Sequence, residues 1–285
     1  MSAAVLDPSA FAEQIREDIA ANRIQLSTLP EVALRVREAV ENEDSNAATI
    51  AEIVTQDPAL TTRLLQVANS ALYRGARSID NIQMAVTRMG LKLVRNLVIS
   101  LAMKQMFQAT SDALDHAFRR IWNDSVEAAA IARVLATNVR GLEPEQAMLA
   151  GLIHNIGALP VLTKLDLELG FDTDRTLVER LLNEIAPALG RDMLREWQFA
   201  DCLVEVPVAC LDLKRERERA DYADLVLVAR LEHLASSGKL DADTSPMEWP
   251  NYSAFARVGV DTEITVLEME GPAEQIAEVR SLLSG

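Results

Sequence analysis

Aromatic residues are scarce in this 285-residue chain, and its apolar runs are short. Phe, Trp and Tyr make up 4% of the sequence, whereas apolar residues together make up 49%. Alanine and leucine must therefore fill the interior, which suits helices that pack on helices. No apolar run reaches the roughly 20 residues needed to span a membrane. The first residues also lack a basic segment followed by an apolar one, so the sequence predicts no secretion signal and a cytoplasmic protein.

Positive charge is also in short supply. The chain has 28 basic and 43 acidic residues, which give a formal net charge of -15. A nucleic acid or an anionic membrane binds a basic surface, so neither is expected as the main partner. The one locally basic stretch, residues 214–219, alternates in sign. That alternation is typical of a solvated helix face.

Cysteine occurs only at Cys202 and Cys210. On one helix these residues would be separated by roughly 12 Å, which is too far for a disulfide. Their spacing does not suit a metal site either. We interpret both as buried, reduced thiols.

Helix signals follow one another along the chain with almost no strand alternation, which predicts an all-α fold. Residues 108–113 are the expected linker between two halves, and residues 236–250 are expected to be loop. Residues 260–283 are expected to be helical, although residues 264–267 have strand propensity. Caps or prolines mark helix starts at Asp7-Pro8, Leu29-Pro30, Ser45, Asp57-Pro58, Ser78 and Glu143-Pro144.

Residues 147–159 form the most informative stretch. This expected helix carries apolar residues on nearly all of its faces, so it should be buried. Small residues such as Gly151 should let other helices approach it closely. One polar pair, His154-Asn155, interrupts the apolar run, and Gly157 is expected to end the helix. A buried polar pair is costly without partners. Those partners are either a metal and a substrate or other side chains.

Several blocks of the sequence, taken in order, resemble the HDOD domain family. They are residues 26–30, 57–70, 78–90, 122–125 and 150–157, followed by Trp197 and residues 225–230. The signature positions within them are Asp57, Pro58, Asn69, Ser70, Gly90, Trp122, Gly151 and Gly157. The resemblance implies an all-helical fold in which an N-terminal helical bundle packs on an HD-like C-terminal helical bundle. It also implies a bacterial signalling or regulatory setting.

The resemblance divides the chain into four segments. Residues 1–25 would form a leading helix, residues 26–110 the N-terminal helical subdomain, and residues 111–235 the HD-like subdomain. Residues 236–285 would form a loop and a C-terminal helical tail.

The resemblance also implies a degenerate metal site. HD-type hydrolases bind a divalent cation with a His, a His-Asp pair and a distant Asp, and the cation activates a water. Here the first His aligns with Asp124, the pair is His154-Asn155, and the last Asp aligns with Arg230. One clear ligand is too few for a catalytic site, which usually keeps three. We therefore expect no catalytic residue, no metal and no cofactor, with His154 as a hydrogen-bonded core histidine.

The arginine suggests what replaced the cation. Arginine is permanently charged and presents a fork of donors that matches a carboxylate, so we expect Arg230 to pair with Asp124. The remaining histidines, His116 and His233, stand alone in the sequence and are expected to have packing or surface roles. Further histidines of the family would fall near Ala186 and at Cys210-Leu211.

The function predicted from the sequence is non-enzymatic. It is that of a regulatory or scaffold protein in bacterial signal transduction, acting through contacts with unknown signalling proteins, with a homo-oligomer left open. One alternative is an HD-type metal-dependent phosphohydrolase or phosphodiesterase. The other is a small-ligand sensor that reuses the old cleft. A complete set of metal ligands would be needed by the enzyme and not by the scaffold or the sensor.

Overall fold

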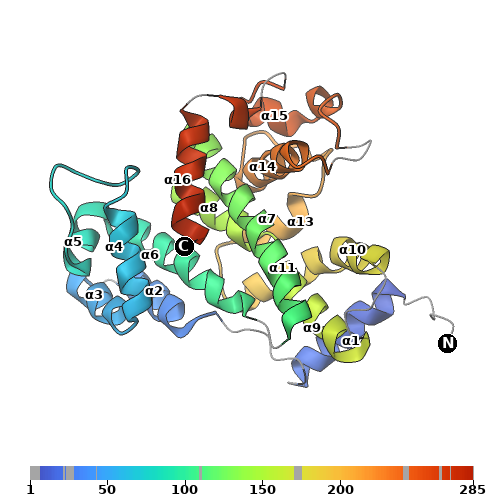
Figure 1. The fold of residues 1–285 in the computed structure, drawn as a ribbon, viewed down its shortest axis with the longest axis horizontal. Helices are drawn as coiled ribbons and strands as arrows, with labels where there is room; N and C mark the ends of the chain where they lie inside the picture. The colour runs from blue at the N-terminus through green and yellow to red at the C-terminus, as the bar shows by residue number, and fades with distance from the viewer. Residues whose placement is uncertain are drawn as a thin grey trace.

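The computed structural model describes residues 7–21, 23, 29–42, 44–108, 111–169, 175–239, 244–262, 265–269 and 271–284. Every regular element in these residues is a helix, which confirms the all-α class. Two groups of helices lie side by side, and the long helix α7 (Asp112–Ala136) crosses the larger one (Figure 1).

The smaller group holds the first half of the chain. It comprises α2 (Glu31–Glu41), α3 (Ala47–Thr55), α4 (Pro58–Ala68), α5 (Ile82–Met89) and α6 (Leu91–Met103), continued by the 3-10 helix η1 (Lys104–Phe107). Asp57 caps α4 as predicted, because its Oδ1 accepts from the Leu60 backbone N–H at 2.9 Å. Gly90 joins α5 to α6 with a φ of 88°, a conformation that glycine adopts without a steric penalty.

Two predicted helix starts are wrong by one and by three residues. The cap of α3 is Asn46 rather than Ser45, and the cap of α5 is Asn81 rather than Ser78. In both cases an asparagine oxygen accepts from backbone N–H groups of the first turn. Asn ranks with Ser as an N-cap, so residue type alone does not choose between neighbouring candidates.

The larger group is built around α7. It adds α8 (Pro144–Ile153), α9 (Ala158–Leu169), α10 (Arg175–Glu184), α11 (Ala186–Glu196), α12 (Asp201–Val204), α13 (Val206–Ala209) and α14 (Tyr222–Ser236). The leading helix α1 (Pro8–Ala20) packs on α9 of this group, where buried Asp18 and Lys164 form an ion pair. The described part of the predicted linker is short, because Ser111 already caps α7.

One stretch, Pro144–Leu167, is long and apolar enough by composition to span a membrane, contrary to the expectation that no run reaches that length. Inside the fold, 89% of its most apolar window is buried. The stretch therefore forms the centre of the larger group, and its apolar character is explained by helix packing.

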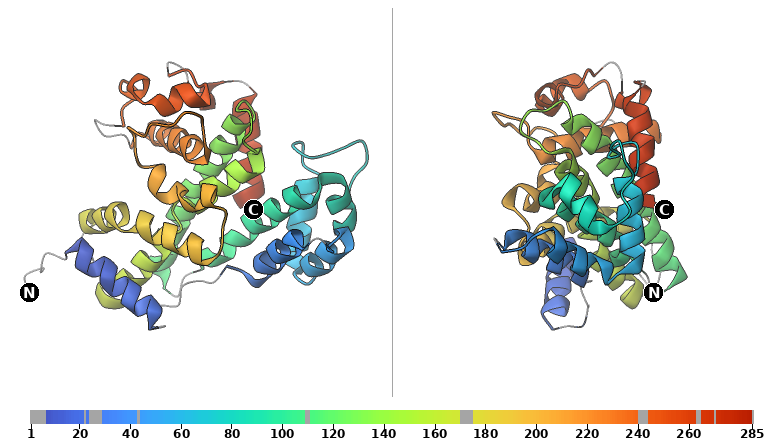
Figure 2. Two further views of the ribbon diagram at one scale, coloured as in Figure 1. Left: turned by 180° about the vertical axis from the view of Figure 1, so that it is seen from behind. Right: turned by 90° about the vertical axis from the view of Figure 1, so that its left-hand side faces the viewer.

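The last helix, α16 (Pro272–Ser284), is a brace between the two groups rather than a tail. It lies against α7 and also reaches α4 (Figure 2). Arg63 of α4 donates to the Leu282 carbonyl at 2.9 Å, and Lys104 donates to the Ser284 carbonyl at 2.8 Å. Among the described residues of the predicted helix at 260–283, only those from Pro272 are α-helical. Val266–Glu268 form the 3-10 helix η3, and residues 263, 264 and 270 lie outside the described residues.

Two further polar contacts join the groups. The Tyr73 hydroxyl, after α4, donates to Glu145 of α8 at 2.9 Å. Within the larger group, Arg133 of α7 donates to the same carboxylate at 3.0 Å. Arg37 of α2 is buried and donates to the Trp197 carbonyl at the end of α11. Because these donors and acceptors come from distant segments, they fix how the two groups meet.

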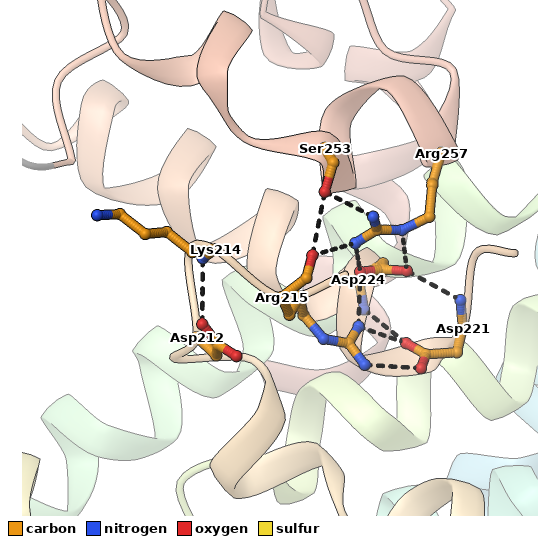
Figure 3. A network of polar contacts seen from close by, with 7 residues as sticks. All are labelled: Asp212, Lys214, Arg215, Asp221, Asp224, Ser253 and Arg257. Atoms are coloured by element: carbon orange, nitrogen blue, oxygen red, sulfur yellow. Dashed lines mark hydrogen bonds and ion pairs between the residues drawn. The ribbon is translucent and has the colours of Figure 1, made fainter. Parts of the chain in front are cut away.

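The predicted solvated helix at residues 214–219 is wrong: this stretch is an irregular loop, and Arg215 within it is buried. The Arg215 guanidinium donates to Asp221 at 2.7 Å and to Asp224 at 2.6 Å (Figure 3). Arg257 of α15 (Ser253–Val258) donates to the same Asp224 at 2.7 Å. This cluster, which we call the Asp224 cluster, ties the segment after α14 to the larger group.

The expectation that both cysteines are buried thiols is right for only one of them. Cys210 is buried, but Cys202 is exposed, and both are free thiols. The Cys202 side chain is exposed because α12 is a single short turn at the surface of the larger group.

Candidate functional site

Helix α8 ends four residues before the predicted end at Gly157. Ile153 is its last residue, His154 is its C-cap, and a turn leads to α9, which begins at Ala158. The polar pair His154-Asn155 therefore lies at a buried helix end, as expected, but in a turn between two helices.

The two signature glycines here permit close backbone contacts. A Cβ atom on Gly157 would lie 1.9 Å from the Ala186 carbonyl oxygen and 2.4 Å from the Gly190 nitrogen. Gly157 does not adopt a left-handed conformation, so its role is to let α11 approach rather than to end the helix. A Cβ atom on Gly151 would lie 2.4 Å from the Cα of Ala129, which confirms the close helix approach predicted from the small residues.

His154 is 4% exposed, and its Nδ1 lies 2.6 Å from the Gly151 carbonyl oxygen. A carbonyl only accepts, so Nδ1 carries the proton and Nε2 carries a lone pair. Burial, followed by the positive charge of Arg230, lowers the pKa of His154 to about 3. The imidazole is therefore neutral at physiological pH and could serve as a metal ligand only if others joined it.

His154, Asn155 and Arg230 line one small cleft of about 40 Å³. The positions where further family histidines would fall, Ala186 and Cys210-Leu211, line the same cleft. The structure thus brings together positions that lie far apart in the sequence. A buried water needs roughly 10–15 Å³ of such space, so the cleft has room for a few waters only, whereas ligand pockets usually measure about 300–1,000 Å³.

Asp124 does not join this cleft. Its Oδ1 lies 3.1 Å from Nε2 of His233 and 3.8 Å from Nζ of Lys239. Burial alone would raise the pKa of Asp124, but the hydrogen bond from His233 and the charge of Lys239 outweigh it and lower the pKa. The Asp124 carboxylate is therefore ionised, and it already interacts with His233 and Lys239. His233, which was expected to have a packing or surface role, is the hydrogen-bond partner of Asp124.

The predicted pair between Arg230 and Asp124 is not formed among the described residues. Arg230 Nη1 donates instead to the Cys210 carbonyl at 3.0 Å, at the end of α13. Asp124 forms its hydrogen bond with His233 instead, which lies about one turn after Arg230 on α14. Asp124 and Arg230 therefore have different partners. The guanidinium of Arg230 still places a positive charge beside His154.

The donor set does not fit a divalent cation. The cleft presents one imidazole, the amides of Asn155 and Asn183, the Cys210 thiol and one guanidinium, and it lacks a carboxylate among its lining residues. Burial raises the pKa of the Cys210 thiol, which is therefore protonated and a poor metal ligand. Across the described part of the chain, no group of three or more His, Cys, Asp or Glu side chains could hold a metal ion. A guanidinium repels a cation, so no metal-dependent step can be derived from these residues.

Other signature positions have structural roles. Asn69 ties the end of α4 to the loop before α5: its Nδ2 donates to the Ile79 carbonyl, and its Oδ1 accepts from the Ile79 N–H, both at 2.7 Å. The neighbouring Ser70 hydroxyl is buried and has no hydrogen-bond partner among the described residues. Trp122 of α7 packs on Phe107, with ring centroids 5.2 Å apart. Pro58 occupies the first turn of α4, beside the Asp57 cap.

Comparison with solved structures places the whole described architecture among known helical folds. A protein from Shewanella amazonensis SB2B, named as a candidate metal-dependent phosphohydrolase, is 28% identical, with a TM-score of 0.82. The similarity covers 97% of this chain and 99% of that one. A protein from Marinobacter aquaeolei VT8, named as a candidate signal transduction protein, is 22% identical, with a TM-score of 0.60. That similarity covers 99% of this chain and 67% of the other, and at this identity it shows the fold alone.

Sequence comparison gives a relative and a family. An uncharacterised protein from Treponema pallidum (strain Nichols) is 32% identical over 143 residues, which is 48% of this chain. The match spans only 26% of that protein, about a quarter of its length. The HDOD domain model matches residues 26–210, well over half of the sequence, and overlaps the predicted signature blocks. The chain belongs to the HDOD domain family.

Proposed function

We propose that this protein is a non-enzymatic regulatory or scaffold protein of a bacterial signalling pathway, acting in the cytoplasm through contacts with other proteins. The observation that supports this most is Arg230, a permanent cation that lines the cleft of His154, where an HD-type enzyme needs an anionic ligand. The name of the Marinobacter aquaeolei relative agrees with a signalling role. Affinity capture from the source cell, followed by reconstitution with the purified partner, tests the protein contacts.

The second candidate is a metal-dependent phosphohydrolase. It is favoured by the name of the Shewanella amazonensis relative, whose structure is similar over nearly the full length of both chains. Neutral His154 with a free Nε2 lone pair also suits a metal ligand. Against it stand the amide of Asn155 and the engagement of Asp124 with His233 and Lys239.

We expect neither the natural chain nor Asn155→Asp to hydrolyse phosphate esters. The substitution restores one carboxylate, but Arg230 still lines the cleft and Asp124 still bonds His233. The measurement is the turnover of p-nitrophenyl phosphate and of bis-p-nitrophenyl phosphate, with Mn²⁺, Fe²⁺, Ni²⁺ or Zn²⁺ added separately. The rate should equal that of His154→Ala.

The control is His116→Ala, because His116 is an exposed histidine on α7. A metal-dependent rate that is lost in His154→Ala and kept in His116→Ala would favour the phosphohydrolase. Turnover by Asn155→Asp alone would show that the lost ligands have been assigned to the wrong positions.

A further inference from the structure

A second and much larger cleft in the described structure has none of the HD-site positions in its lining. It measures about 930 Å³ and lies between α4 and η1 of the smaller group, α7 of the larger group and the end of α16. Its volume is in the upper part of the range of about 300–1,000 Å³ that holds small-molecule ligands. It is therefore large enough for a ligand that the cleft of about 40 Å³ beside His154 could not admit.

The lining of this cleft combines apolar and cationic side chains. Leu60, Leu101, Phe107 and Trp122 supply the apolar surface. The cations are Arg63, Lys104 and Arg119, each from a different element, and the only acidic lining residue is Asp115. In a chain with a net charge of -15, this local excess of positive charge stands apart from the rest of the composition. A concave site of this kind attracts anions.

Each of the three cations has a partner, and the two arginines have further N–H donors. Arg63 and Lys104 each donate to a carbonyl at the end of α16, which anchors them at the edge of the cleft. Arg119 pairs with Asp115 at 2.7 Å, and its side chain is 72% exposed. A guanidinium has five N–H donors, so both arginines can bond an anion without breaking these contacts.

Trp122 closes one wall of the cleft and belongs to its apolar lining. Its side chain is 5% exposed, and its Nε1–H is buried and has no acceptor among the described residues. Because this N–H is shielded from solvent, Trp122 offers an occupant of the cleft its aromatic ring and not a hydrogen bond.

We propose that the cleft between the two groups of helices binds a small amphiphilic anion: a carboxylate, sulfonate or phosphate attached to an apolar ring or chain. The acidic group bonds Arg119 and Arg63, and the apolar part lies against Leu60, Leu101 and Phe107. Because the cleft joins elements of both groups, an occupant contacts α4 and α7 together. This site goes beyond the proposed function and does not depend on whether the HD-site positions are catalytic.

The test uses 8-anilinonaphthalene-1-sulfonate, which carries aromatic rings and one sulfonate. We expect a saturable rise in its fluorescence with one dye bound per chain. Arg119→Glu should weaken binding by about tenfold, because it turns one attractive charge into a repulsive one. Trp122→Phe keeps an aromatic wall and removes only a shielded N–H, so it should weaken binding by less than Arg119→Glu does.

The matched control is Arg120→Glu. Arg120 is the next residue on α7, its side chain is 52% exposed, and it does not line the cleft. It should bind the dye like the natural chain, and equal thermal unfolding temperatures will show that both variants fold. The absence of saturable binding, or equal effects of the two substitutions, would overturn the proposal. So would unchanged binding in Arg119→Glu, since the dye would then occupy another surface.

Discussion

Asp224→Asn is expected to lower the free energy of unfolding by about 3–5 kcal/mol, the range found when one partner of a buried ion pair is removed. Asp224 is fully buried at the N-terminal turn of α14, and its carboxylate accepts from Arg215 and Arg257. The two arginine side chains are only 5% and 10% exposed. With an amide at position 224, two buried guanidinium groups would share the single carboxylate of Asp221. The uncompensated charge explains the size of the effect.

Urea-induced unfolding measures this free energy, and Asp212→Asn is the matched control. Asp212 lies just before the same loop and is exposed, and its side chain accepts from the Lys214 backbone N–H (Figure 3). An exposed substitution of this kind should change the stability by no more than about 0.5 kcal/mol. If Asp224→Asn were no more destabilising than Asp212→Asn, the Asp224 cluster would not hold the C-terminal segment.

Gly157→Ala is expected to cost about 3 kcal/mol of stability, at the upper end of what overpacking a core usually costs. The added Cβ would lie 1.9 Å from the Ala186 carbonyl oxygen and 2.4 Å from the Gly190 nitrogen. Both are backbone atoms, so no side chain can rotate away, and α11 as a whole must shift. Ala186 also lines the cleft of His154, so the shift would change that cleft as well.

Gly75→Ala is the control, because it makes the same substitution where no backbone atom lies close to the added Cβ. Its Cβ would first meet the Arg88 side chain at 3.3 Å, and that flexible side chain can move. No loss of stability is expected there, because a compatible Gly→Ala change also restricts the unfolded chain. Thermal unfolding of both variants is the measurement. A Gly157→Ala protein as stable as Gly75→Ala would show that the backbones lie farther apart than described.

Local rules predicted the helices and part of the candidate site. Asp57-Pro58 predicted the start of α4 because capping depends on residues three positions apart. The small residues around Gly151 predicted a close helix contact because Cβ size alone limits the approach. The HDOD resemblance brought His154, Asn155 and Arg230 to one place, and the structure lines one cleft with all three.

The failures concern contacts between distant segments. The sequence could not show that His233 rather than Arg230 reaches Asp124, because this depends on how α14 is rotated against α7. Arg215 looked like part of a solvated face, since its partners Asp224 and Arg257 lie 9 and 42 residues away. Gly157 looked like a helix end, because the same residue type also serves close backbone contacts.

The metal content of the purified protein tests the central claim most directly, namely that the HD-site positions no longer form a metal site. Protein purified without chelator and dialysed is analysed by inductively coupled plasma mass spectrometry for Mn, Fe, Ni and Zn, beside His154→Ala and His116→Ala. Because the cleft offers one imidazole, two amides, a buried thiol and the Arg230 cation, but no carboxylate, we predict far less than one equivalent of each metal, and the same content in all three proteins. One equivalent that survives dialysis in the natural chain and in His116→Ala, but disappears in His154→Ala, would contradict the claim.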